Sequence, residues 1–163
     1  LADAAWLEHV ATRLVAWRSR LKRRTERLAQ IHGDFHPFNV LFAAGVQFTL
    51  LDRSRGPLGE PADDVTAMAI NYLFFGLQQP PYQLAAPFLD LWTIFWQTYL
   101  ERSGDQAILQ VVQPFFIWRA LVVASPVWYH VADPVRRQLF RFIEHMLDAG
   151  VFEPAAVERY LQN

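Results

Sequence analysis

The stretch that decides the fold is residues 31–42, IHGDFHPFNVLF, in which two histidines, an aspartate and an asparagine lie between apolar flanks. One interpretation is a polar turn between buried strands, in which Asp34 forms an Asx-turn and His32 is a hydrogen-bonded, partly buried histidine. A second is a metal-dependent hydrolase whose ligands for zinc, manganese or iron are His32, Asp34, His36 and Asp52. A glycine and a proline inside the segment make it a poor regular strand, which weighs against the hydrolase.

The third interpretation is the catalytic loop of a phosphotransferase. Such an enzyme needs a carboxylate that accepts a hydroxyl proton, an asparagine that holds Mg²⁺, and a second metal-binding aspartate beyond a short hairpin. Asp34, Asn39 and Asp52 occur in this order, with Asn39 five residues after Asp34 and Asp52 thirteen residues after Asn39. Phosphoryl transfer depends on positioning and charge neutralisation, and Mg²⁺ prefers hard oxygen ligands. The spacing therefore matches the catalytic-loop pattern HxDxxxxN.

Short β-like segments follow this loop, and a long helical pattern precedes it. Residues 39–42 and 46–51 are rich in β-branched and aromatic side chains and flank a turn, which predicts a hairpin. The hairpin would bring the loop and Asp52 together at one end. Over residues 3–28, apolar residues recur at steps of three, four and seven, which predicts a long amphipathic helix at the surface.

Beyond the loop, the sequence predicts helices only. Aspartates suit the N-caps, prolines the first turns and glycines the C-terminal positions, and Pro114 should kink or split its helix. No second β region, internal repeat or linker is expected, so the fold class is mainly α with one small β-hairpin. The predicted helices span residues 63–77, 83–102, 105–124, 134–149 and 154–162.

The loop and the later segment FTLLDRSRGPLGEPADDVTAMA, residues 48–69, together resemble the aminoglycoside phosphotransferase and choline kinase family. This family is the small-molecule branch of the protein-kinase-like fold, and the glycine of HGD favours it over the protein kinases, which usually carry arginine there. The resemblance implies that Asp34 is the catalytic base and that Asn39 and Asp52 hold Mg²⁺. It also implies that Asp64, within GEPADD, is a structural aspartate that braces the catalytic loop.

In this resemblance the histidines take supporting roles. His36 either hydrogen-bonds the transferred phosphate or shapes the loop, whereas His32 packs beneath the loop and hydrogen-bonds the backbone. ATP binding in such a fold also needs an N-terminal lobe with a strand lysine. Residues 1–28 predict a helix instead, and Lys22 is the only lysine of the chain. We therefore expect the C-terminal lobe of the protein-kinase-like fold, with the N-terminal nucleotide lobe absent.

The expected organisation is a single kinase-like C-terminal lobe over residues 1–163. A leading helix occupies 1–30, the catalytic loop, hairpin and metal-binding loop occupy 31–62, and a helical acceptor-binding part occupies 63–163. Because the first residue is leucine, we expect a fragment of a longer chain that is inactive alone.

The expected function is transfer of the γ-phosphate of ATP, with Mg²⁺, to a hydroxyl of a small molecule. One alternative is a non-catalytic, pseudokinase-like binding module that holds a ligand or a partner protein without transfer. The other is the metal-dependent hydrolase described above.

The composition indicates which classes of partner and which compartment to expect. A net charge of -1 gives no overall basic field for nucleic acid. Seven of the fifteen lysines and arginines lie in residues 13–27, and we interpret this run as the solvated face of the leading helix. No apolar run reaches the roughly 18 residues of a membrane span. The absence of cysteine excludes thiolate sites and fits a reducing compartment, so we expect a cytoplasmic protein.

The acceptor is expected to bind among the later helices. Residues 104–163 contain six acids and five arginines, which does not indicate a polycationic acceptor. Aromatic residues are abundant there and in the preceding helices, and they belong either to the core or to a pocket that stacks on sugars or quaternary ammonium groups. They are Phe74, Phe75, Trp92, Phe95, Trp96, Phe115, Phe116, Trp118, Trp128 and Tyr129.

Overall fold

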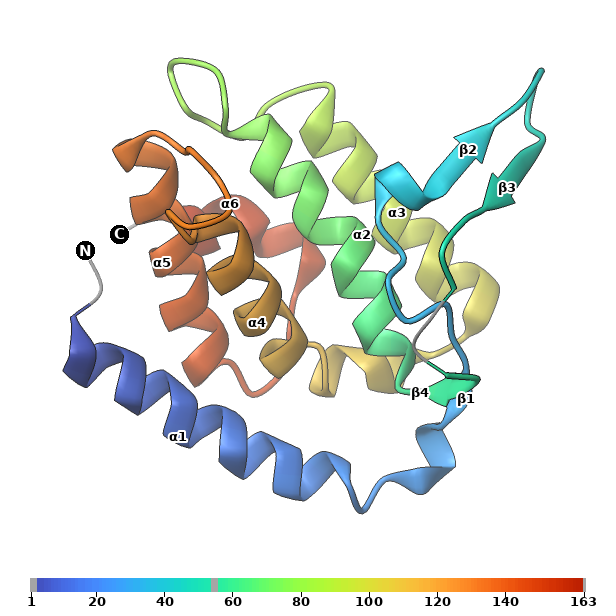
Figure 1. Ribbon diagram of the computed structural model, residues 1–163, viewed down its shortest axis with the longest axis horizontal. Helices are drawn as coiled ribbons and strands as arrows, with labels where there is room; N and C mark the ends of the chain where they lie inside the picture. Colours follow the sequence, from blue (N-terminus) through green and yellow to red (C-terminus); the bar gives the residue numbers. More distant parts are fainter. Residues whose placement is uncertain (1–2, 54–55, 163) are drawn as a thin grey trace.

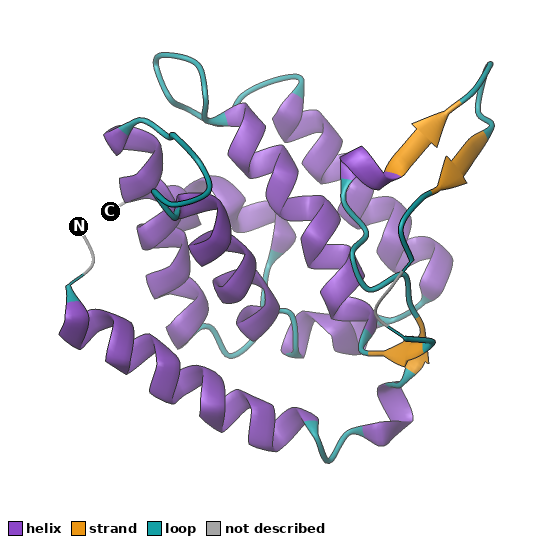
Figure 2. Cartoon of the chain, in the orientation of Figure 1, coloured by secondary structure: helices purple, strands orange, loops and turns teal. Residues whose placement is uncertain are grey.

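The structure is a computed structural model that describes residues 3–53 and 56–162. The chain is mostly helical, and its short strands lie at one end of the molecule (Figures 1 and 2). This confirms the mainly α prediction. The helices are α1 (Ala4–Leu21), α2 (Pro61–Gly76), α3 (Phe88–Ser103), α4 (Gln113–Ala124), α5 (Asp133–Asp148) and α6 (Val157–Leu161).

Helix α2 lies at the centre of the helical layer. It packs against α3 on one side and α4 on the other, and α4 in turn packs along α5 (Figure 1). Helices α2 and α4 are apolar around most of their circumference, as buried helices are. The largest buried side chains stack between α3 and α4, where the ring centroids of Trp92 and Phe116 are 5.9 Å apart. Much of the aromatic content is therefore core.

Helix α1 crosses the outside of α4 and α5, as predicted for an amphipathic surface helix (Figure 1). Its Val10 is buried, and the ring of Trp6 lies 5.2 Å from that of Phe140 on α5. The helix ends at Leu21 rather than at residue 28, which corrects the prediction. The chain leaves the helical conformation at Arg24 and continues as a 3₁₀ turn, Thr25–Arg27.

The early end of α1 allows Arg27 to turn inward. Its guanidinium donates to Glu60 and Asp105 at 2.6 to 2.8 Å, and its side chain is 9% exposed. The Arg27 guanidinium lowers the pKa of Asp105, whereas burial and the neighbouring Asp105 raise the pKa of Tyr99 to about 12. The interpretation of the basic run as a solvated face is therefore wrong for Arg27, although Arg18 and its exposed neighbours fit it.

The predicted hairpin is present. Strands β2 (Val40–Phe42) and β3 (Phe48–Leu50) pair antiparallel, with Leu41 opposite Thr49. A second small sheet was not predicted, in which β1 (Ala29–Gln30) pairs with β4 (Leu58–Gly59). Two-residue strands are too short to show an alternating pattern, so this pairing left no signal in the sequence. It places Gln30, just before the candidate site, next to Leu58, which follows it in the chain.

Several helix boundaries differ from the prediction because of proline. The predicted helix 105–124 is split into a 3₁₀ turn, Gln106–Gln110, and α4, as Pro114 indicated. Helix α3 begins after Pro87 rather than at residue 83, since the residue before a proline avoids the helical conformation. Helix α2 begins at Pro61, with the Glu60 side chain as its N-cap, rather than at residue 63. A last 3₁₀ turn, Pro154–Ala156, leads into α6.

No helix in the described ranges is both long enough and apolar enough to cross a lipid bilayer.

Candidate active site

The first half of the loop is held by the N-terminal turn of α2. Both carboxylate oxygens of Asp64 accept backbone hydrogen bonds, from the His32 N–H at 2.5 Å and from the Gly33 N–H at 2.8 Å. Gly33 has a φ of 86°, a left-handed conformation that glycine adopts without strain. A carboxylate that binds two successive N–H groups fixes the peptide that precedes Asp34. This is the geometry that a bracing aspartate needs.

His32 joins this loop to the strand that leads to Asp52. The ring is buried, with Nε2 2.7 Å from the carbonyl oxygen of Leu51 and Nδ1 accepting the backbone N–H of Asp34 at 3.3 Å. The Leu51 N–H in turn donates to the carbonyl oxygen of Asn39 at 2.9 Å. Leu51 is thus bonded to both halves of the loop, and Asp52 is the next residue. The ring of His32 has the packing and backbone contacts that the sequence predicted for it.

Asp34 and Asn39 are connected directly. The Asn39 side-chain amide donates from Nδ2 to the backbone carbonyl of Asp34 at 2.9 Å, across a 3₁₀ turn, Pro37–Asn39. Because the nitrogen end of the amide is used within the loop, its oxygen is the end that remains for a cation. The loop thereby orients an asparagine oxygen next to the residue expected to be the base.

Among the described residues, two nitrogen-bearing side chains flank the Asp34 carboxylate. Nε2 of His36 lies 3.6 Å from one carboxylate oxygen, and Nη1 of Arg119 lies 3.5 Å from the other. Arg119 also forms a closer ion pair with Asp63, at 2.7 Å from Nη2. The Asp34 side chain is about a quarter exposed. Asp34 therefore lies in a small charged cluster near the surface.

Sequence reasoning missed Arg119. It lies 85 residues after Asp34, on α4, and belongs to no motif of the loop. Its Nε is buried without a hydrogen-bond partner among the described residues. The sequence does mark Arg119 in one respect, because it is the only charged residue in the apolar helix QPFFIWRALVVA. A buried arginine in such a helix requires an anionic partner.

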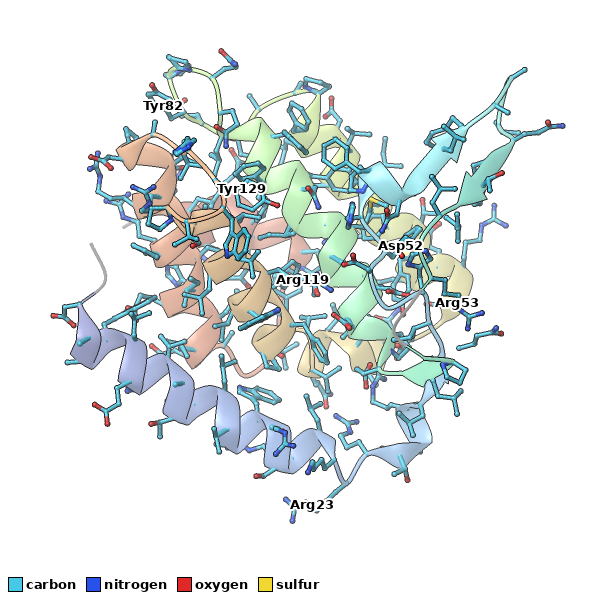
Figure 3. All side chains as sticks on the ribbon, viewed as in Figure 1. Arg23, Asp52, Arg53, Tyr82, Arg119 and Tyr129 are labelled. Carbon is cyan, nitrogen blue, oxygen red and sulfur yellow. The ribbon has the colours of Figure 1, made fainter. Side chains whose placement is uncertain are left out.

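Asp52 has an unusual backbone conformation. Its φ is 56°, which is uncommon for a residue other than glycine, and it is exposed. Within the described ranges no side chain pairs with its carboxylate. In Figure 3, Arg119 lies between α4 and α2, and Asp52 lies beyond α2 on the side of the hairpin. Such left-handed outliers are concentrated at functional sites, which makes Asp52 a candidate ligand.

Asn39 and Asp52 fit a magnesium ion in their donor chemistry. Both offer hard oxygen atoms, and Mg²⁺ is commonly held by one or two protein oxygens together with water and substrate phosphates. Arg53, which follows Asp52, donates from Nε to the carbonyl oxygen of Ile31 at 3.1 Å and so supports the loop. Arg55, the other arginine of this segment, lies outside the described residues.

The hydrolase alternative needs three or more clustered ligands. Within residues 3–53 and 56–162, no three histidines, aspartates or glutamates are arranged to hold a metal ion. Both ring nitrogens of His32 already have backbone partners. The structure therefore brings His32, Asp34 and His36 close together without forming the ligand set that this alternative requires.

No protein-family model, curated protein or solved structure matches this chain. The kinase-like interpretation therefore depends on the sequence pattern and on the geometry of the loop.

Proposed function

We propose that this chain carries the catalytic loop of an ATP- and Mg²⁺-dependent phosphotransferase that acts on a hydroxyl group of a small molecule. The observation that carries the proposal is the set of hydrogen bonds that joins Asp34, Asn39 and the segment before Asp52 into one loop. Asn39 donates a hydrogen bond to the Asp34 backbone, and Leu51 is hydrogen-bonded to both Asn39 and His32. The Asp64 carboxylate accepts a hydrogen bond from the His32 N–H. Residues expected to act together are thereby fixed relative to one another.

Each residue has a role that follows from its chemistry. Asp34 orients the acceptor hydroxyl and takes its proton as the new O–P bond forms, while the bond between the γ-phosphorus and the bridging oxygen of ATP breaks and ADP leaves. Asn39 and Asp52 would hold Mg²⁺, which neutralises charge on the phosphates when it is bound. Arg119 and His36 lie close to a group placed at Asp34, where Arg119 offers positive charge and His36 a hydrogen bond to the transferred phosphate. The cluster thus offers a base, a metal site and cationic support at one place.

The test is ATP turnover with a panel of small alcohols, by a protein that includes both this chain and the nucleotide-binding lobe that the resemblance implies. Asp34→Asn should lower kcat by roughly 10²- to 10⁴-fold, the usual contribution of a positioned acid or base, and Asp52→Asn should lower it by removing a ligand of Mg²⁺. Asp148→Asn removes an exposed carboxylate near the end of α5 and should leave the rate unchanged. Chelation of divalent metal should stop turnover. Full activity in Asp34→Asn would refute the assignment.

A further inference from the structure

A small pocket adjoins the Asp34 cluster. It opens between the loop, α2, α4 and the segment after α4, and its volume is about 110 Å³. His36 and Arg119 form the wall nearest the loop, and both lie within 3.6 Å of the Asp34 carboxylate. A molecule in the pocket would therefore contact the two side chains that lie beside the Asp34 carboxylate. Asp34 is not among the described lining residues, so the hydroxyl group of an acceptor would extend past His36 and Arg119 to reach it.

The rest of the wall is mainly apolar and aromatic. Phe38 from the loop, Phe74 and Phe75 from α2 and Tyr129 after α4 form a continuous row of rings, with centroids 5.2 to 6.0 Å apart. Phe38 is 74% exposed and Tyr129 is 38% exposed, so the row reaches the surface. Rings at the mouth of a pocket suit a flat apolar group, because aromatic pairs gain about 0.5–1.5 kcal/mol beyond the burial of area.

The charges of the wall favour a neutral ligand over a cationic one. Among the described residues that line the pocket there is no carboxylate, and the ionisable ones are Arg119, His36 and Tyr129. Asn71 adds one polar group, whose Nδ2 donates to the Ala67 carbonyl at 2.7 Å, so that its oxygen can accept a hydrogen bond. Arg119 is itself paired with Asp63 and Asp34, so a polyamine or quaternary ammonium ion in the pocket would find no described carboxylate in the wall to pair with it. A neutral ligand with one hydrogen-bond donor fits this wall.

The volume limits the size of the bound group. An apolar cavity of roughly 150 Å³ is known to hold benzene. At about 110 Å³, this pocket accepts no more than one ring or a short branched alkyl group inside, with the remainder at the open mouth. On the premise that the proposed function holds, we infer that the acceptor is an uncharged alcohol whose body is a single aromatic ring or an apolar group of similar size.

Binding can be tested without nucleotide, using benzyl alcohol as the probe and ligand-observed NMR on the intact protein. Ala67 is buried in the wall, so Ala67→Leu fills the pocket and should abolish binding. Tyr129→Ala removes one exposed ring without changing the core and should weaken binding about two- to tenfold. Trp128→Ala is the matched control, because Trp128 is 75% exposed and does not line the pocket, and it should leave binding unchanged.

Equal binding of benzyl alcohol to all three variants and the unmodified protein would overturn the inference. Preferential binding of choline or spermidine over benzyl alcohol would also overturn it. Benzyl alcohol and choline, which both carry a hydroxyl group, are then offered as acceptors with ATP. Transfer to choline without binding of benzyl alcohol would refute the ligand class and leave the phosphotransferase standing. Pocket-dependent binding of benzyl alcohol without transfer to any alcohol would refute the phosphotransferase and leave the ligand class standing.

Discussion

Replacement of Asp64 by alanine should release the loop of residues 31–42 from α2. The change removes the acceptors of two backbone N–H groups, those of His32 and Gly33, and both residues are buried. A hydrogen bond to a charged group contributes about 1.5–3 kcal/mol, and a buried N–H left without a partner loses a similar amount. Two such bonds imply a loss of about 3 kcal/mol or more in the free energy of local opening. That loss corresponds to an increase of roughly 10²-fold in the open population.

The assay is native-state hydrogen exchange at the amides of His32 and Gly33, together with denaturant unfolding. Asp90→Ala is the matched control, because Asp90 also lies in the first turn of a helix, α3, but is exposed. It should lose only the helix-dipole contribution of about 0.3–1 kcal/mol. Equal losses in the two variants would refute the bracing role. So would unchanged exchange at the two loop amides in Asp64→Ala.

Three further predictions concern other contacts. Arg119→Lys keeps the charge but loses the planar fork that reaches two carboxylates, so kcat should fall at least about tenfold; an unchanged rate would contradict this role. Arg27 lowers the pKa of Asp105 in the folded state, so this ion pair stabilises the fold fully above the unfolded-state pKa of about 3.9, and the stabilisation is lost as pH falls further. Asp105→Asn should therefore flatten this part of the acid unfolding profile. An unchanged profile would refute the linkage. Gly76→Ala should destabilise the fold by about 1–3 kcal/mol in denaturant unfolding, since its Cβ would lie 2.9 Å from that of Phe88, whereas Gly150→Ala meets no atom within 4 Å and should change little.

The fold could be predicted from the sequence where the signal was local. The hairpin is rich in β-branched and aromatic residues on both sides of a turn, and Pro114 interrupts a helix for a steric reason that acts within a few residues. The end of α1 was predicted too late because its cause is distant. Arg27 turns away from the helical pattern to reach Glu60 and Asp105, which lie 33 and 78 residues further on. No periodicity in residues 3–28 records that pairing.

The residues of the candidate site also divide into those that the sequence pattern indicated and those that only the packing of helices brings to the loop. Asp34, Asn39 and Asp52 were named because their spacing along one loop is fixed by the chemistry expected of them. Asp64 was named from the family resemblance, and its contacts with the loop amides became visible only in the structure. Arg119 and the pocket walls come from helices that are brought to the loop by packing of α2 against α4. Such residues follow no spacing rule and were not predicted.

Arg119 connects the two parts of the proposed centre. Its guanidinium pairs with Asp63 at the start of α2 and lies beside the Asp34 carboxylate, while the same side chain forms one wall of the pocket proposed for the acceptor. Any ligand that fills the pocket must therefore pack against a residue that contacts Asp34. Because this wall is shared, the size of the bound group and the orientation of Asp34 are coupled. An acceptor too large for the pocket would displace Arg119 and weaken its contact with Asp34, so selection for a small apolar group and positioning of the base depend on one side chain.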